Sequence, residues 1–178
     1  SHILFLFFQL AKRDIAARYK GSALGQLWSL LSPLLLLAVY TFVFSVVFQA
    51  RWGDLNQSKT FFALNLFAGM ILHGFLAECM SRSTSLLQQN QNYIKRIVFP
   101  LRLLPLVISS TALFHAAISM LVLLVATWLL QGALPWHSLL IPIYIAPILV
   151  LATGLSLALA ALGLFIRDLG QLIPMLTT

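Results

Sequence analysis

Long runs without a charged residue are the feature that most constrains how this chain folds. From Leu103 to Ile166 the sequence has 64 residues without Lys, Arg, Asp or Glu. At about 1.5 Å per residue, a helix of that length would cross a hydrocarbon core of about 30 Å roughly three times. The run must therefore fold back on itself. The Gly, Pro and Trp residues between Gln131 and His137 mark the turn.

The composition also indicates a membrane protein. Hydrophobic residues make up 61% of the chain and charged residues 8%, whereas a soluble domain has about 45–50% apolar and about 25% charged residues. Because a span needs about 20 apolar residues, the charge-free runs predict an all-α membrane protein in a single transmembrane domain. We expect spans at 27–50, 60–80, 105–130 and 139–166, and the start of another apolar segment at 167–178.

The basic residues indicate how the spans are oriented. The net charge of +7 would suit nucleic acid, but these residues lie in short clusters between apolar runs, which fits anionic lipid headgroups better. One side of the predicted spans carries only Arg51 and Lys59. The other side carries Lys12, Arg13, Arg18, Lys20, Arg82, Lys95, Arg96, Arg102 and Arg167. This asymmetry predicts a cytoplasmic amino terminus, and we expect membrane lipids but no nucleic acid as partners.

Residues 1–22 are predicted to form an amphipathic helix in the cytoplasmic interface. One face of such a helix would carry the apolar residues Leu4, Phe8, Ala11, Ile15 and Tyr19. Asp14 and Arg18 are spaced to pair on this helix, as are Glu78 and Arg82 at the end of the second span. The alternative is a solvated leader without a role at the membrane.

Motifs for nucleotide or metal binding are not found. The segment from Gly21 to Gln26 has two glycines but lacks the Lys of a phosphate-binding loop. The four histidines are scattered and no cysteine cluster accompanies them, so we predict no metal site and no bound cofactor. A membrane enzyme such as an acyltransferase would need clustered His, Asp or Ser at a membrane face, and the sequence shows no such cluster. A secondary transporter would need acidic residues within the membrane, and only Glu78 comes near it.

Aromatic residues repeat every four positions along the first predicted span, at Tyr40, Phe44 and Phe48. Sugar rings have apolar C–H faces that stack on aromatic rings, so this stripe, together with Trp28, would suit a channel for a glycan. The same spacing is equally typical of packing against a neighbouring helix or of contact with lipid.

The segment after the second span, 83–97, is predicted to form a short cytoplasmic helix. Leu86, Leu87, Ile94 and Ile97 would give it an apolar side, and residues 88–92 would offer amides to a partner. A membrane subunit that does not hydrolyse ATP itself needs a rigid element of this kind to receive force from a partner protein. The alternative is a solvated loop whose basic residues only set the topology.

Three motifs, in this order, resemble one known family. They are Arg18-Tyr19-Lys20-Gly21-Ser22 with Leu24-Gly25, Trp28 and Pro33; residues 90–100 with Leu104-Pro105-Leu106; and Arg167-Asp168-Leu169. Each lies at an expected membrane boundary. Together they resemble the membrane subunits of polysaccharide ABC exporters, the O-antigen and teichoic-acid group, over essentially the whole chain.

The resemblance implies a homodimeric channel, six spans per full subunit, and a separate ABC ATPase that binds ATP and Mg²⁺. The substrate would be a polysaccharide linked to polyprenyl diphosphate, carried along Trp28, Tyr40, Phe44 and Phe48. Contact with the ATPase would fall on Leu86, Leu87, Asn90, Asn92, Tyr93, Ile94 and Lys95. We further expect Arg18, Lys20 and Arg96 to meet the diphosphate. An ABC permease for teichoic acid, another lipid or a drug is the runner-up.

Overall fold

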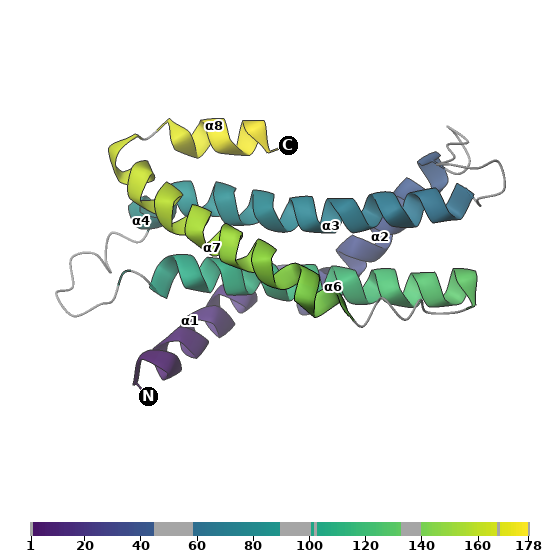
Figure 1. Cartoon of the computed structure of the whole chain (residues 1–178). Helices are drawn as coiled ribbons and strands as arrows, with labels where there is room; N and C mark the ends of the chain where they lie inside the picture. The colour runs from purple at the N-terminus through teal and green to yellow at the C-terminus, as the bar shows by residue number, and fades with distance from the viewer. Residues whose placement is uncertain are drawn as a thin grey trace. The chain divides into compact units, whose positions relative to one another are not determined.

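A computed structural model shows a chain built from α-helices (Figure 1). It describes residues 2–44, 59–89, 101, 103–132, 140–166 and 168–177. The elements are α1 (His2–Arg18), the 3-10 turn η1 (Gly25–Leu27), α2 (Trp28–Phe42), α3 (Lys59–Thr84), α4 (Leu86–Gln89), α6 (Leu103–Gln131), α7 (Ile141–Phe165) and α8 (Leu169–Leu176). No strand occurs among these described residues, and the predicted all-α fold is confirmed.

Among the residues that the structure describes, four segments are long and apolar enough to cross a membrane, as predicted. They are Gly25–Phe42, Phe62–Thr84, Leu103–Leu130 and Ile143–Phe165. Between 11% and 33% of each is buried within the chain, so most of their side chains are left for lipid or for other protein surfaces.

The second of these helices, α3, is longer than its predicted span. It continues to Thr84, so Ser83 lies inside α3, although the separate cytoplasmic helix was predicted to begin at that residue. Within the predicted range 83–97 the structure gives the short helix α4, and residues 90–97 lie outside the described part of the chain.

The chain divides into two compact units. The α1 unit comprises Ser1–Lys20, Phe75–Phe114 and Pro142–Thr178, and the α2 unit comprises Gly21–Gly74 and His115–Ile141. Helices α3 and α6 therefore contribute residues to both units.

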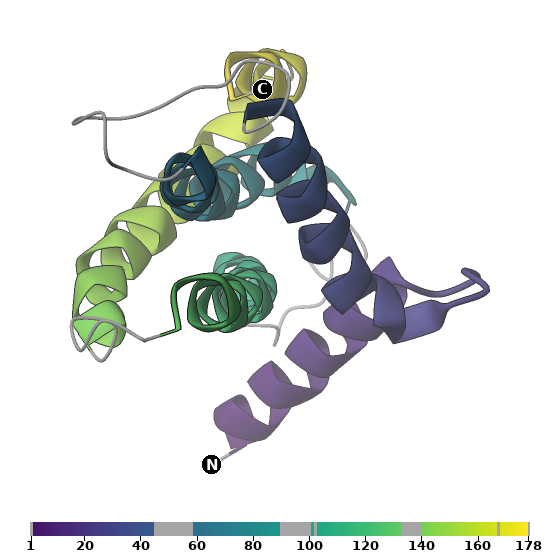
Figure 2. The ribbon, with the colours of Figure 1, turned by 90° about the vertical axis from the view of Figure 1, so that its right-hand side faces the viewer.

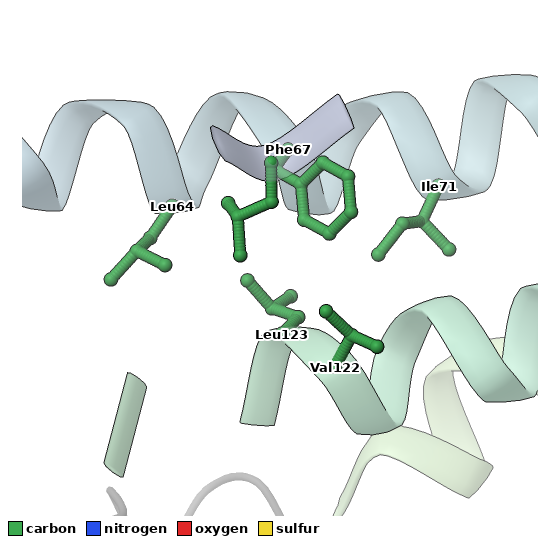
Figure 3. Packing of buried hydrophobic residues seen from close by; sticks show 6 residues of the cluster. Leu64, Phe67, Ile71, Val122 and Leu123 are labelled. Atoms are coloured by element: carbon green, nitrogen blue, oxygen red, sulfur yellow. The ribbon is translucent and has the colours of Figure 1, made fainter. Parts of the chain in front are cut away.

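The core of the α2 unit follows from helical spacing. Leu64, Phe67 and Ile71 lie three or four positions apart, so they share one face of α3. They point toward Val122 and Leu123 of α6 (Figure 3), and Leu37 of α2 completes the cluster. Phe67 is only 1% exposed. This cluster joins the three helices of the unit.

In the α1 unit, small side chains let α7 approach α3 closely. The buried positions of α7 include Ala152, Ser156, Ala160 and Gly163. The Ser156 hydroxyl donates a 3.4 Å hydrogen bond to the Cys79 carbonyl oxygen of α3. A Cβ atom at Gly163 would overlap the backbone carbonyl of Thr84. Small residues are the usual means of such close packing between apolar helices.

Helices α1 and α8 complete the α1 unit. Figure 2, in which α3 and α6 are seen nearly end-on, shows α1 running across them instead of alongside them. Helix α8 folds back after α7, and the hydroxyls of Ser81 and Thr177 lie 3.2 Å apart. The carboxyl end of α3 is therefore in contact with both α1 and α8.

Candidate functional site: a charge network between α1 and α3

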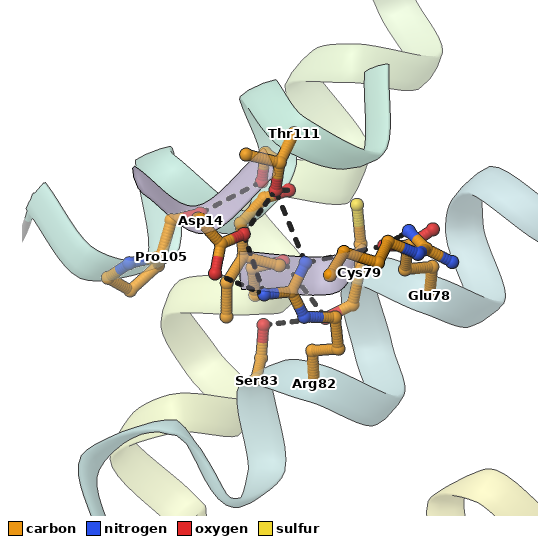
Figure 4. A network of polar contacts seen from close by, with 11 residues as sticks. Asp14, Glu78, Cys79, Arg82, Ser83, Pro105 and Thr111 are labelled. Atoms are coloured by element: carbon orange, nitrogen blue, oxygen red, sulfur yellow. Dashed lines mark hydrogen bonds and ion pairs between the residues drawn. The ribbon is translucent and has the colours of Figure 1, made fainter. Parts of the chain in front are cut away.

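Four charged side chains meet where α1 crosses the end of α3 in the α1 unit (Figure 4). Asp14 and Arg18 come from α1, and Glu78 and Arg82 come from α3. Each pair is four residues apart, so both members lie on the same face of their helix. Two acids and two arginines make the group neutral as a whole.

The distances show that the pairs connect the two helices. Arg82 Nη2 lies 2.7 Å from both carboxylate oxygens of Asp14, and Arg82 Nη1 lies 3.3 Å from Glu78 Oε1. Arg18 Nη1 lies 2.6 Å from the same Glu78 oxygen. Charge-assisted hydrogen bonds of this length are among the stronger ones in proteins.

The network extends to α6 through a buried threonine. The Thr111 hydroxyl donates a 2.9 Å hydrogen bond to Asp14 Oδ2 and accepts a 3.3 Å bond from Arg82 Nη1. Thr111 is 1% exposed. Three helices are therefore joined by one set of polar contacts.

The four charged groups are only partly screened by solvent. The exposed fraction of the side chain is 17% for Glu78, 28% for Asp14, 35% for Arg82 and 45% for Arg18. These groups line a cavity of about 530 Å³ together with Ala17 and Ser81. Ion pairs away from bulk water are screened less by salt than pairs on an open surface, but each charge also loses some of its hydration.

Tyr19 adds a neutral hydroxyl next to these charges. Burial raises the pKa of its phenol above the usual value, Arg18 lowers it, and Glu78 raises it further. The net direction is upward, so Tyr19 keeps its proton at physiological pH.

The pairing predicted from sequence is half confirmed. Glu78 and Arg82 do pair on α3. The pair expected within α1, Asp14 with Arg18, is wrong, because Asp14 bonds Arg82 and Arg18 bonds Glu78. The sequence pattern places Asp14 only on the helix predicted for residues 1–22. The signal for its wider role was an acidic residue in a basic, apolar helix, in a chain with four acidic residues in all.

The residues predicted to contact the ATPase are only partly described. Leu86 is buried in a cluster with Leu104, Ile108 and Ala160, and Leu87 packs against that cluster. The remaining residues lie outside the described part of the chain, namely Asn90, Asn92, Tyr93, Ile94 and Lys95.

The residues predicted to line the channel lie on α2 and beyond its end. Trp28 is half-buried at the start of α2. The rings of Tyr40 and Phe44 stack with centroids 6.0 Å apart, and Phe44 lies 5.6 Å from the ring of Phe62. Phe48 is outside the described residues.

Of the residues predicted to meet the diphosphate, Arg18 is part of the charge network. Lys20 is exposed just after α1, and Arg96 is outside the described part of the chain. Whether the three residues meet therefore stays a prediction.

Comparisons with known proteins agree with this architecture. Residues 5–178 match the family model described as "ABC-2 type transporter". The chain is 29% identical over 174 residues to the O-antigen export system permease protein RfbA of Myxococcus xanthus, covering 97% of the chain and 64% of that protein. It is 26% identical over 176 residues to a protein of the same name from Klebsiella pneumoniae, covering 98% of the chain and 65% of that protein.

The chain thus spans less than two thirds of the length of these relatives. The family match nevertheless covers nearly every residue of the chain, including the four candidate spans found in its described part. The chain belongs to the ABC-2 type transporter family.

Proposed function

We propose that this chain is part of the transmembrane subunit of an ATP-driven exporter that carries a lipid-linked, O-antigen-like polysaccharide across the cytoplasmic membrane. The observation that carries this proposal is the family match over residues 5–178. The relatives named as O-antigen export permeases, which match over 97% and 98% of the chain, support the choice of substrate. The full subunit would act as a homodimer, with its amino terminus in the cytoplasm of the cell.

A separate ABC ATPase would bind ATP and Mg²⁺ and would transmit its movement through the segment from Leu86 to Lys95. The burial of Leu86 against Leu104 and Ile108 supports this assignment, because it fixes the start of the segment on α6. The charge network supports it as well, since α1 is joined to α3 and α6 at the same end of the unit. A movement of the ATPase against this end of the α1 unit would therefore be transmitted to α1, α3 and α6.

The glycan would pass along Trp28, Tyr40, Phe44 and Phe48. The stacking of Tyr40 on Phe44 supports an aromatic surface on α2, although contact between Phe44 and Phe62 also serves packing within the unit. At the cytoplasmic face the diphosphate would meet basic residues. Because Arg18 is already paired with Glu78, we assign the larger share of this contact to Lys20 and Arg96.

The test is reconstitution of the full-length protein with its ATPase in proteoliposomes. We expect the lipid-linked polysaccharide to stimulate ATP hydrolysis, and we expect no transport when the Walker A lysine of the ATPase is replaced. Stimulation by a drug or an unglycosylated lipid but not by the polysaccharide would favour the runner-up, an ABC permease for another substrate. Transport without any ATPase would overturn both the polysaccharide exporter and the ABC permease for another substrate.

A further inference from the structure

The cavity beside the charge network, of about 530 Å³, is large enough to hold a ligand. Sites for small molecules usually measure about 300–1,000 Å³. Residues of α1 and α3 line it, namely Asp14, Ala17, Arg18, Glu78, Ser81 and Arg82. Because most of these side chains are charged, the cavity suits an ionic group better than an apolar one.

The charges of the lining cancel one another. Two acids, Asp14 and Glu78, meet two arginines, Arg18 and Arg82. The contacts order them in alternation, from Asp14 through Arg82 and Glu78 to Arg18 (Figure 4). An ion of a single sign would bring a charge that this lining does not balance. A zwitterion, which carries one charge of each sign, keeps the cavity neutral and pairs with both kinds of side chain.

The end of the network formed by Arg18 and Glu78 has the capacity for such a ligand. Asp14 is held by Arg82 through both carboxylate oxygens and by Thr111. Glu78 instead receives both of its arginine contacts on Oε1, and Arg18 reaches it through Nη1. A carboxylate accepts hydrogen bonds on both oxygens, and a guanidinium has several N–H donors. Within the described part of the chain, Glu78 Oε2 and the other N–H groups of Arg18 therefore remain for a ligand.

The position of the cavity along α3 selects a membrane lipid as the zwitterion. Glu78, Ser81 and Arg82 lie near the end of the span Phe62–Thr84. The ends of transmembrane helices lie at the depth of the lipid headgroups. A headgroup can therefore reach the cavity while its acyl chains stay beside the apolar residues that precede Glu78 in α3.

We propose that this cavity binds the headgroup of phosphatidylethanolamine. The phosphate accepts hydrogen bonds from Arg18, and the ammonium donates to Glu78 Oε2. The ammonium must carry N–H groups to do so, and the trimethylated nitrogen of phosphatidylcholine has none. The lipid thereby bridges α1 and α3 where Arg18 and Glu78 already meet, independently of the substrate that the transporter carries.

The test is native mass spectrometry of the full-length protein in detergent, with added lipids that share their acyl chains and differ only in the headgroup. We expect phosphatidylethanolamine to be retained about tenfold better than phosphatidylcholine, the effect of a hydrogen bond between charged groups. The N-monomethyl and N,N-dimethyl forms should fall between the two. Equal retention of phosphatidylethanolamine and phosphatidylcholine would overturn the proposal, and so would a preference for anionic phosphatidylglycerol.

Ala17→Leu tests the cavity as the site. Ala17 is an exposed residue of α1 and lines the cavity, so the larger side chain should occupy the space and abolish the preference for phosphatidylethanolamine. The control is Ala16→Leu, the same change at a neighbouring exposed residue of α1 that is not among those lining the cavity. A preference that survives Ala17→Leu, or that is lost equally in both variants, would exclude the cavity.

Glu78→Gln tests the contact with the ammonium. It should lower the retention of phosphatidylethanolamine to that of phosphatidylcholine and leave the retention of phosphatidylcholine unchanged. Asp168→Asn removes a carboxylate from an exposed residue that is not among those lining the cavity and should keep the preference. Loss of the preference in both variants would mean a general effect of charge and would overturn the proposal. Displacement of phosphatidylethanolamine by undecaprenyl diphosphate, with the same dependence on Ala17, would identify the carrier lipid as the occupant and overturn the assignment to a phospholipid.

Discussion

Arg82 Nη2 lies 2.7 Å from both carboxylate oxygens of Asp14, which is 68 positions earlier in the chain. This contact joins α1 to α3. We expect Asp14→Asn to lower the free energy of unfolding by about 1–2 kcal/mol, between the values for exposed and for buried ion pairs. Denaturant unfolding of the purified protein in detergent measures the change.

Asp168→Asn is the matched control for this prediction. Asp168 is exposed, and its side chain makes no capping hydrogen bond at the start of α8. Its replacement should change the stability by less than about 0.5 kcal/mol. In a double-mutant cycle with Arg82→Gln, Asp14→Asn should show a coupling of about 1 kcal/mol. A coupling of zero would show that the contact does not stabilise the protein.

Gly163 provides a second test, of the close approach between α7 and α3. A Cβ atom there would overlap the Thr84 carbonyl, and a backbone atom cannot move aside as a flexible side chain can. We expect Gly163→Ala to destabilise the protein by about 1–3 kcal/mol, the usual cost of overpacking. Gly154→Ala on the same helix meets no atom within 4 Å, so it should be neutral or stabilising by up to about 1 kcal/mol. Similar melting temperatures for the two variants would contradict this packing.

The aromatic side chains of α2 test the proposed path of the glycan. We expect both Phe44→Ala and Phe44→Leu to reduce export of a long polysaccharide several-fold, because neither replacement offers a ring for a sugar to stack on. The exposed Phe42 supplies the control Phe42→Ala, which should export normally. Normal export by Phe44→Leu would mean that Phe44 only packs against Phe62.

Introducing negative charges into the proposed contact with the ATPase tests that contact. Replacing Tyr93 and Ile94 together with Asp should uncouple ATP hydrolysis from export and leave membrane insertion unchanged, because two carboxylates disrupt an apolar contact. The same two charges at Leu55 and Gln57, in the segment predicted to lie on the opposite side of the membrane, should leave coupling intact. Normal export with Asp at 93 and 94 would show that the ATPase contacts another segment.

The orientation is tested by labelling with a membrane-impermeant maleimide. Cys79, the one cysteine of the chain, is buried and should not react. A cysteine placed at Asn90 should react only from the cytoplasmic side, and one at Asn56 only from the outside, as the distribution of basic residues predicts. The reverse pattern would mean that the amino terminus is outside.

The spans could be predicted because lipid imposes a local rule on the sequence. A run of about 20 uncharged residues is sufficient evidence for a helix that crosses the membrane. Spacing within one helix also brings Glu78 within reach of Arg82, but the same spacing at Asp14 and Arg18 gives no pair, because both residues find partners on another helix. The spans and the pair of Glu78 with Arg82 were both predicted from residues that are close in the sequence, without the positions of other helices.

The end of α3 was harder to predict because its residues are polar. Nothing between Glu78 and Gln89 is Gly or Pro. The hydroxyls of Ser83 and Thr84 donate to the carbonyl oxygens of Cys79 and Ser81 at 2.6 Å and 2.8 Å. Because these hydroxyls are satisfied within α3, polar side chains alone do not mark the end of the helix.

The contacts of Asp14 with Arg82 and of Gly163 with Thr84 could not be predicted. Both depend on how one helix lies against another, and the chain separation of 68 residues in the first case gives no local pattern. Helical spacing identifies which residues share a face but does not say which helix that face meets.

The spacing of the four charges also affects how easily α1 and α3 could part. Each helix has its own acid and arginine, one turn apart. If the two helices separated, Asp14 could turn to Arg18, and Glu78 would keep Arg82, to which it is already bonded. Each of the four charged side chains would then still have an oppositely charged side chain on its own helix. The ion pairs between the helices therefore hold α1 against α3, while each helix has an acid and an arginine of its own, which lowers the electrostatic cost of separating the two.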